Sequence, residues 1–339
     1  MKKLLYIALF LLTTFFLVGC DQEYSFSLDA TVVAVRDSIT VEYTLNDPEK
    51  ELSSSEVKAE LATKENSKVV STKTLSFDKE TKKGSVKFSS LESKTSYVLT
   101  IYAGYDGEKV VLFSKEEQTL DQGADEETPY EISSAEDFEK YVKNDNKGYF
   151  KLLNDIDLEG KTYTPFFTST TQFLGHFDGN GHKIKNYIVG TKSVVDGVTS
   201  YGKTTIATDY YGLFGYIGEG GIVTNVTLEN FQFHAYRVSS SKTYYGLIAG
   251  YCKGTISNVK VVNSLMNLET RGATSEYHIA ALVGQLTGTG VISNCTVDCD
   301  IKVNGKNNVK LGGIVASTLG STAKDAVSNC NYTLNRHCL

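Results

Sequence analysis

Apolar and polar residues alternate in short runs between residues 24 and about 120. One run places Ile39, Val41 and Tyr43 at every second position. A period of two is the spacing of side chains on one face of a β-strand. Six or seven such runs, separated by polar turns, predict an all-β fold that begins with a β-sandwich over residues 21–120.

A different pattern fills the second part of the chain, where an apolar residue, a variable residue and asparagine recur together. The intervals between the asparagines are 39, 33, 36 and 35 residues, and a glycine-rich apolar segment such as G-L-F-G precedes each of the last four. Periods of this length indicate stacked structural repeats. The recurring asparagines are Asn186, Asn225, Asn258, Asn294 and Asn329.

Positions one and three after each asparagine are mostly apolar, as in Val259 and Val261 around Lys260. We expect these side chains to point inward from stacked rungs of a parallel β-helix. The five asparagines then form a structural ladder where each strand turns. On this interpretation Asn258→Ala costs about 1–3 kcal/mol, because hydrogen-bonding groups lose their partners.

Two further segments complete the predicted organisation. Residues 121–129 are acidic and lack apolar periodicity, which predicts a linker that does not pack. Residues 133–136 read S-S-A-E, the spacing of a helix capping box, and Phe138 and Val142 follow on one face. We expect a short helix that caps the β-helix, which occupies residues 130–339.

The spacing between repeats varies mainly before each glycine-rich segment. These stretches should leave the coil on one side, where repeat proteins often bind ligands, and tyrosines border them. The alternative is that the tyrosines only shield the bases of loops. The variable stretches are residues 190–209, 234–244, 267–278 and 304–310, and the candidate ligand-binding tyrosines are Tyr201, Tyr210, Tyr236, Tyr244 and Tyr277.

The order of these motifs resembles a known family. Residues 149–158 read YFKLLNDIDL, residues 173–184 read FLGHFDGNGHKI, and the G-L-x-G and I-x-N repeats follow. The series resembles bacterial surface proteins with GLUG-type repeats, which also occur in the N-terminal region of IgA1-cleaving metalloproteases. The resemblance implies a right-handed parallel β-helix used for attachment or display. The chain lacks an H-E-x-x-H motif, so the protease activity does not carry over.

A second resemblance concerns the first domain. Leu91, Thr95 and Tyr97 give the series L-x-x-x-T-x-Y ahead of a strand. This series resembles the tyrosine corner of fibronectin type III and immunoglobulin-like domains, which implies that the Tyr97 hydroxyl bonds to the backbone. Ser93 stands where that family usually has proline, and Tyr43 where tryptophan is common.

The N-terminus indicates export. Lys2 and Lys3 precede an apolar stretch that ends in L-V-G-C at Cys20, which resembles a bacterial lipobox. We expect residues 1–20 to be a lipoprotein signal peptide, with lipid attached to Cys20 and an extracytoplasmic, membrane-anchored mature chain. The alternative is an ordinary signal peptide.

Charge and cysteine content narrow the function further. The formal net charge is −6 with only four arginines, so nucleic acid is not an expected partner. Five cysteines remain besides Cys20, and Cys295 and Cys330 should stack in neighbouring rungs, either as core residues or as a disulfide. We expect no metal, no cofactor and no catalytic residues, because Asp155 and Asp157 lack matching carboxylates in a neighbouring rung.

These observations predict a lipid-anchored surface protein that binds glycan or protein ligands, in other words an adhesin. The alternative is a stalk or surface-layer spacer without a specific ligand, and a polysaccharide lyase or hydrolase is the third hypothesis. No polar cap follows the repeat at Val327. We therefore expect one of three situations: the sequence is truncated after this rung, the rung pairs with another molecule, or the rung frays.

Overall fold

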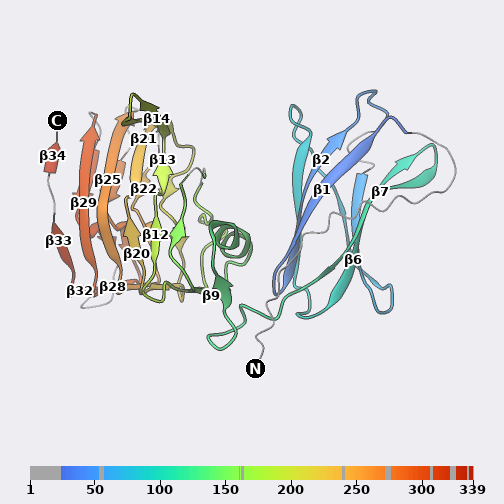
Figure 1. The fold of residues 1–339 in the computed structure, drawn as a ribbon, viewed down its shortest axis with the longest axis horizontal. Coiled ribbons are helices and arrows are strands. Elements are labelled where there is room, and N and C mark those ends of the chain that lie inside the picture. The colour runs from blue at the N-terminus through green and yellow to red at the C-terminus, as the bar shows by residue number, and fades with distance from the viewer. Residues whose placement is uncertain are drawn as a thin grey trace.

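The computed structural model is all-β, with one short helical segment. It describes residues 24–338, apart from residues 53–56, 160, 162–163, 239–240, 272–275, 306–307, 321–325 and 334–335. The proposed signal peptide and Cys20 lie outside the described residues. Figure 1 shows two bodies, an N-terminal one and a larger C-terminal solenoid.

The N-terminal body consists of two antiparallel sheets, ordered β1-β2-β5 and β4-β3-β6-β7. One cluster of buried residues lies between them, and the alternation noted in the sequence is visible in it, since Ile39, Val41 and Tyr43 are all at most 3% exposed. The strands are β1 Ser27–Ala34, β2 Ser38–Asn46, β3 Val57–Thr63, β4 Val69–Thr74, β5 Lys83–Ser89, β6 Ser96–Tyr105 and β7 Glu108–Gln118.

Two tyrosines tie strands of this body to neighbouring loops. The Tyr97 hydroxyl accepts a hydrogen bond from the backbone N–H of Glu92 at 3.0 Å. The Tyr43 hydroxyl donates to the carbonyl oxygen of Ser76 at 3.0 Å. Each bond satisfies a polar group that burial of the ring would otherwise leave unpaired.

The C-terminal body is a parallel β-solenoid of about three turns. Sheet 1 contains β8 Tyr130–Ile132, β9 Tyr149–Leu152, β11 His176–Asp178, β19 Ile222–Thr224, β24 Thr255–Ser257, β28 Val291–Ser293 and β32 Val327–Ser328. Sheet 2 contains β10 Ile156–Asp157, β12 Lys183–Lys185, β13 Ile188–Val189, β16 Thr204–Thr205, β20 Thr227–Glu229, β21 Gln232–Val238, β25 Lys260–Arg271, β29 Thr296–Asn304, β33 Asn331–Thr333 and β34 Arg336–Cys338.

Two four-stranded sheets close each turn. Sheet 3 contains β17 Tyr210–Tyr211, β22 Thr243–Tyr245, β26 Glu276–Ala280 and β30 Asn308–Gly312. Sheet 4 contains β18 Gly215–Ile217, β23 Ala249–Cys252, β27 Val283–Thr287 and β31 Val315–Leu319. A two-stranded hairpin, β14 Thr191–Val195 and β15 Val198–Gly202, extends from the first turn.

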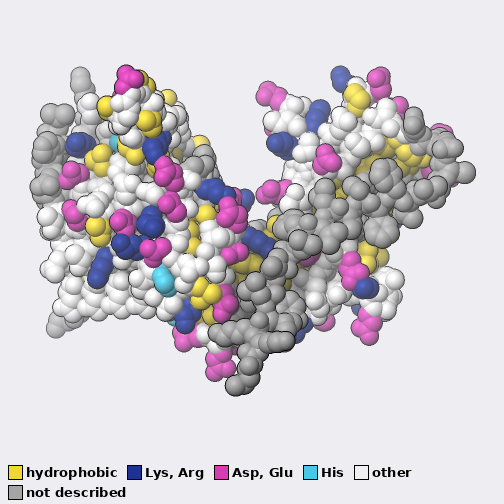
Figure 2. Space-filling view, in the orientation of Figure 1, with side chains coloured by type: hydrophobic (Ala, Val, Ile, Leu, Met, Phe, Trp, Pro, Cys, Tyr) yellow, Lys and Arg dark blue, Asp and Glu magenta, His cyan; other side chains and the backbone are white. Residues whose placement is uncertain are grey.

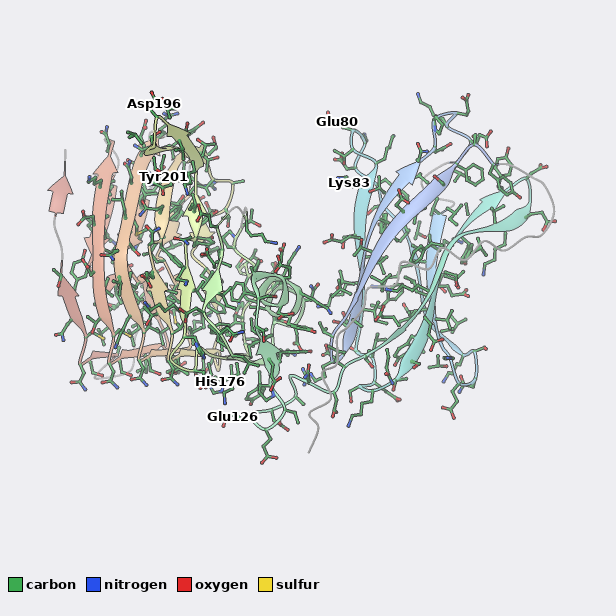
Figure 3. All side chains as sticks on the ribbon, viewed as in Figure 1. Glu80, Lys83, Glu126, His176, Asp196 and Tyr201 are labelled. Atoms are coloured by element: carbon green, nitrogen blue, oxygen red, sulfur yellow. The ribbon has the colours of Figure 1, made fainter. Side chains whose placement is uncertain are left out.

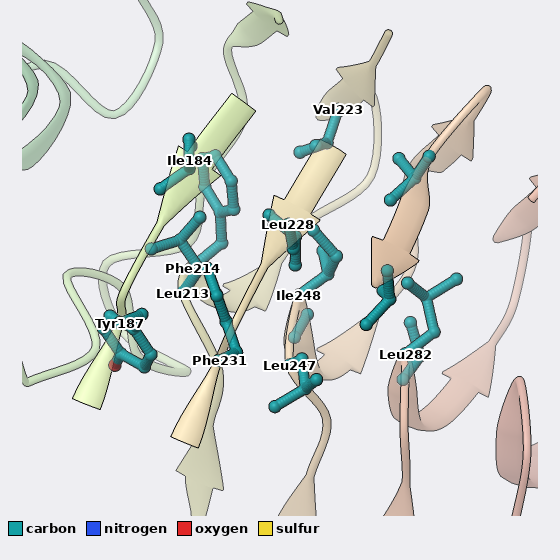
Figure 4. Packing of buried hydrophobic residues seen from close by; sticks show 14 of the residues in the cluster. Ile184, Tyr187, Leu213, Phe214, Val223, Leu228, Phe231, Leu247, Ile248 and Leu282 are labelled. Atoms are coloured by element: carbon teal, nitrogen blue, oxygen red, sulfur yellow. The ribbon is translucent and has the colours of Figure 1, made fainter. Parts of the chain in front are cut away.

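Equivalent residues of successive turns stack inside the solenoid (Figure 4). Leu213 and Phe214 lie next to Leu247 and Ile248 of the following turn, and Leu282 continues the stack; all five are at most 3% exposed. Burying one such aliphatic side chain stabilises a fold by about 1.5–3 kcal/mol. The prediction that positions one and three after each asparagine point inward agrees with the buried side chains in the central repeats.

A short helical segment covers the first turn. The α-helix α1 Ala135–Asp137 continues into a π-helical turn, η1 Phe138–Val142, and Phe138 and Val142 are fully buried. Ser134 is the N-cap and accepts from the backbone N–H of Asp137, whose carboxylate accepts from Ser133 N–H. The cap therefore begins one residue later than the S-S-A-E spacing suggested.

Residues 121–129 pack more closely than a linker was expected to. The buried Gly123 donates its N–H to the Thr128 carbonyl, and its own carbonyl accepts from Tyr149 N–H at 3.1 Å in the first turn. The carboxylate of Asp125 accepts from the backbone N–H and the hydroxyl of Thr128. The segment is a hydrogen-bonded loop, because its own side chains and the first turn satisfy its backbone.

The two bodies also contact each other directly. Val35, in the turn between β1 and β2, is 1% exposed and belongs to the apolar core of the solenoid. The N–H of Arg36 donates to the Tyr130 hydroxyl at 2.8 Å, and that hydroxyl donates to Asp145 at 3.2 Å. The Arg36 guanidinium lies 3.7 Å from the same carboxylate, which is 3% exposed. We call these residues the junction.

The structure corrects the phase of the first repeat. Ile184 pairs in register with Leu228, whereas Phe177 pairs with Val223. Asn186 therefore lies in a different column from the other four predicted ladder residues. This difference is visible in the sequence, because the 39-residue interval before Asn225 is longer than the other three intervals.

The variable stretches were also partly misread. Within the first stretch, residues 191–202 do leave the coil as the hairpin β14–β15, whereas β16 pairs with β21 in sheet 2. Residues 234–238 and 267–271, in contrast, continue β21 and β25, which pair in register from Gln232 and Leu265 to Val238 and Arg271. They lengthen one side of the coil and do not form separate binding loops.

Candidate ligand-binding face

Sheets 3 and 4 each carry a column of side chains that point away from the core of the solenoid, although Tyr216, His278 and Gln285 are at most 5% exposed. In sheet 3, Tyr210 pairs with Tyr244, which pairs with His278 and then Lys310. In sheet 4 the corresponding column is Tyr216, Tyr251, Gln285 and Ser317. The columns touch, because the two sheets meet at an inside corner. We call this surface, without Lys310, the tyrosine face.

Glycine makes the inside corner feasible. A Cβ atom on Gly250 would lie 2.2 Å from the carbonyl oxygen of Tyr244, and one on Gly284 would lie 2.6 Å from the backbone nitrogen of Tyr245. Both obstacles are backbone atoms, so a larger residue would push sheet 4 away from sheet 3. The repeated glycine at the end of the G-L-x-G motif thus brings the tyrosines together.

Four tyrosine rings pack against one another across this corner. Tyr210 stacks on Tyr244 with centroids 5.5 Å apart, and Tyr216 stacks on Tyr251 at 4.7 Å. Edge-on contacts join the columns, with Tyr210 5.2 Å from Tyr216 and Tyr244 5.5 Å from Tyr251. The ring faces cover one another, so a ligand meets mainly ring edges and hydroxyl groups.

The hydroxyl groups of Tyr210, Tyr216 and Tyr244 remain protonated at physiological pH. Burial, together with the neighbouring tyrosines, raises the pKa of Tyr216 and of Tyr244 to about 12, and burial raises the pKa of Tyr210. Tyr210, Tyr244 and Tyr251 are only partly buried. They can therefore both donate and accept hydrogen bonds at the surface.

The face carries little charge. Glu276 and Lys310 are the only Asp, Glu, Lys or Arg residues within the strands of sheets 3 and 4. Sheet 2, which faces the viewer in Figure 2, has acidic and basic side chains scattered over it. Those within its strands include Asp157, Lys183, Lys185, Glu229, Lys260, Glu269, Arg271, Asp298, Asp300 and Lys302. Depletion of charge and enrichment of tyrosine are typical of binding surfaces.

The predicted tyrosines do not form one site. Tyr210 and Tyr244 lie on the tyrosine face. Tyr201, on the hairpin in Figure 3, stacks on His234 at 4.8 Å, and burial lowers the pKa of that histidine to about 4. Tyr236 packs under Arg271 of sheet 2, 4.0 Å from ring centroid to guanidinium carbon.

Tyr277 was predicted wrongly as a ligand contact. Its ring is 1% exposed, and its hydroxyl donates to the carbonyl oxygens of Arg237 and Arg271. The residue points inward because it lies one position from the outward His278. Tyr216 and Tyr251 were not predicted as ligand contacts, although both directly follow the last glycine of a glycine-rich motif.

Asparagines line a second feature, the corner between sheets 1 and 2. The Asn258 amide donates to Asn225 at 3.1 Å, and Asn225 donates to Asp178 at 3.0 Å. A separate column links Asn186 to Asp157 and to Asn230. All five predicted asparagines have φ between 51° and 60°, a left-handed conformation that asparagine tolerates. A shallow groove of about 320 Å³ follows the corner, lined by Asn180, Gly181, Asn225, Val226, Thr227, Asn258 and Lys260.

We expect Asn258→Ala to lower the free energy of unfolding by about 1–3 kcal/mol. The substitution removes the amide bond to Asn225 and places a Cβ-bearing residue without a compensating side chain at φ 55°. Asn258→Gly loses only the amide and should cost less. Urea unfolding of both variants measures the difference, and equal midpoints for wild type and Asn258→Ala would contradict the ladder.

Other candidate chemistry is dispersed. His176 lies 3.2 Å from Glu126, whereas His182 lies 3.5 Å from Asp155 (Figure 3 labels the first pair). Among the residues that the structure describes, no group of three or more His, Cys, Asp or Glu side chains could hold a metal ion. Within the same residues, no helix is long and apolar enough to cross a membrane.

The cysteines predicted to stack do so. Cys295 and Cys330 are equivalent positions of neighbouring rungs, and Asn331 N–H donates to the Cys295 carbonyl. Both are present as free thiols. Burial raises the pKa of Cys295 to about 12, which disfavours the reactive thiolate.

Comparison with known proteins gives limited similarity. No protein-family model matches the chain. A putative Gly-rich membrane protein of Evansella cellulosilytica is 31% identical over 142 residues, which are 40% of this chain and 14% of that protein. Halomucin of Haloquadratum walsbyi is 25% identical over 192 residues, 52% of this chain and 2% of halomucin.

The chain thus matches only a small part of each relative. Among solved structures, a family 28 exopolygalacturonase of Yersinia enterocolitica aligns with 92% of this chain and 90% of its own, at 10% identity and a TM-score of 0.19.

Proposed function

We propose that the protein is an extracytoplasmic surface protein that binds a neutral glycan through its tyrosine face. The main support for this proposal is the corner where four tyrosine rings pack together. The strands of the two sheets that form it contain few charged residues. Ring edges and hydroxyl groups suit a ligand that is itself rich in hydroxyls and C–H groups. A protein ligand, the other class expected from the sequence, would use the same surface.

The proposed location rests on the N-terminal sequence and on relatives. The lipobox-like L-V-G-C at Cys20 favours lipid anchoring, and one relative is named a membrane protein. On this proposal the N-terminal body is an immunoglobulin-like or fibronectin type III-like sandwich that spaces the solenoid from the membrane. The solenoid would be a right-handed β-helix of the GLUG-repeat type.

Single substitutions should separate the tyrosine face from other surfaces. We expect Tyr210→Ala and Tyr244→Ala each to weaken glycan binding at least about tenfold, the loss typical of an interface hot spot. Tyr236→Ala, on sheet 2, is the matched control and should leave affinity unchanged. Calorimetric titration measures the affinities, and circular dichroism confirms that each variant is folded. Equal affinity of Tyr244→Ala and wild type would place the site elsewhere.

The spacer hypothesis has one observation in its favour. The junction buries Val35 in the solenoid core and joins the two bodies by hydrogen bonds and an ion pair. A rigid connection of this kind suits a stalk. The two functions are compatible, because a stiff stalk also presents a binding face away from the membrane.

A further inference from the structure

A chain of three polar side chains lies beside the tyrosines. Ser317 of β31 is hydrogen-bonded through Oγ to Nδ1 of His278 in β26. The other ring nitrogen of His278, Nε2, lies 3.0 Å from the carboxylate of Glu276. Glu276 and His278 are two positions apart on one strand and therefore share its outward side, and Ser317 reaches them across the inside corner.

The surroundings set the protonation of each group. Lys310 lies 2.6 Å and Lys242 3.2 Å from the Glu276 carboxylate, and hydrogen bonds to these lysines lower its pKa to about 2. Burial lowers the pKa of His278 although Glu276 opposes the shift, so the ring is neutral at neutral pH. Nε2 is buried and lies close to Glu276 without a well-formed hydrogen bond. In the tautomer with the proton on Nε2, Nδ1 accepts the Ser317 hydroxyl proton.

The residue types and their order are those of an activated nucleophile. A serine hydroxyl needs an adjacent base, and the base needs a third group that orients it. The Ser317 side chain is partly exposed, whereas His278 is 2% exposed. The nucleophile is therefore accessible and its base is held in place, with the ring of Tyr244 4.8 Å from the imidazole.

We propose that Ser317, His278 and Glu276 form a hydrolytic site for carboxylic O-acyl esters. The Ser317 oxygen attacks the ester carbonyl while its proton passes to His278 Nδ1. The C–O bond to the alcohol then breaks, and the departing alcohol takes that proton. Water attacks the acyl-serine with His278 as base, which releases the acid and restores the serine. Glu276 remains ionised and stabilises the imidazolium.

Gln285 is the expected donor to the developing oxyanion. It lies one rung from Ser317 in the same column and in register with it, so its side chain is on the same side of sheet 4. An amide N–H placed there can stabilise negative charge on the carbonyl oxygen. The expectation that a glycan carries the acyl group rests on the proposed function. The assignment of Ser317 as the nucleophile does not depend on it.

A fluorophosphonate probe tests the nucleophile without any glycan. On the full chain we expect labelling at Ser317, located by peptide mass spectrometry, together with hydrolysis of 4-nitrophenyl acetate. Ser317→Ala should abolish the label and reduce hydrolysis at least about tenfold. Ser293→Ala removes a partly exposed serine of β28 and should change neither. An unlabelled Ser317 in folded wild-type protein would overturn the proposal.

Two further variants test the role of the carboxylate and the specificity of the readout. Glu276→Gln should retain the fold but shift the pH profile of hydrolysis, because the histidine loses its ionised partner. Tyr236→Ala, on sheet 2 and outside both the tyrosine face and this site, should keep the label and the wild-type pH profile. A label that survives in Glu276→Gln with an unchanged pH profile would contradict the role of the carboxylate.

Discussion

Asp145→Ala is expected to lower the free energy of unfolding by about 3 kcal/mol. The carboxylate is 3% exposed and is held by the Tyr130 hydroxyl, the Lys147 backbone N–H and the Arg36 guanidinium. Removing it leaves buried donors without an acceptor and detaches the turn between β1 and β2 from the solenoid. Urea denaturation measures the loss, and hydrogen exchange should show faster exchange at residues 35–38.

Asp145→Asn is the matched control for this experiment. Burial raises the pKa of Asp145, so the ionised carboxylate is itself disfavoured at this site. Asparagine keeps an acceptor for Lys147 N–H and removes the buried charge, and we expect a change within about 1 kcal/mol. If both variants unfold at the wild-type urea midpoint, the junction does not couple the two bodies.

Phe214→Ala should have a comparable or larger effect, about 3–5 kcal/mol. The ring is 1% exposed and lies 4.8 Å from Phe173 and 5.3 Å from Phe177, centroid to centroid. Alanine at this position leaves a cavity in the aromatic cluster of the first turn, which contacts Phe138 of the cap through Phe177. Because sheets 3 and 4 begin here, later turns should lose protection together with the first.

Phe214→Leu provides the comparison for Phe214, since leucine retains most of the apolar volume. We expect it to cost less than half as much as alanine. Thermal unfolding followed by circular dichroism distinguishes the variants. A cost below about 1 kcal/mol for Phe214→Ala would mean that the aromatic cluster is not continuous with the core.

The alternation of residues is the part of the fold that the sequence predicts best. Ile39 and Val41 are buried as their period of two requires, and Val259 and Val261 occupy the predicted inward positions. These positions follow from local geometry, because a side chain on a strand faces the core or the solvent according to its parity. Lys260, between two inward residues, is accordingly exposed.

The site was predictable only in part. Tyr210 and Tyr244 were identified, but their contact with Tyr216 and Tyr251 depends on the angle between two sheets, which no periodicity records. Register errors have the same origin: Asn186 matches the I-x-N motif although it belongs to a separate column.

The junction shows the same limit over a longer range. Arg36 and Tyr130 are 94 residues apart, and no sequence pattern near either residue predicts the contact. Contacts between distant segments are set by how whole sheets meet. Local patterns therefore predict the strands and which side chains point to the core or to solvent. Tertiary packing decides which of these side chains form a site.

The most direct test of the tyrosine face as a glycan-binding surface compares wild-type residues 21–339 with the double variant Tyr210→Ala/Tyr244→Ala on one glycan array. We expect saturable binding of the wild-type chain to a neutral glycan and loss of that binding in a folded double variant. Undiminished binding by the double variant, or no binding by folded wild-type protein, would contradict the assignment of the tyrosine face as a glycan-binding surface.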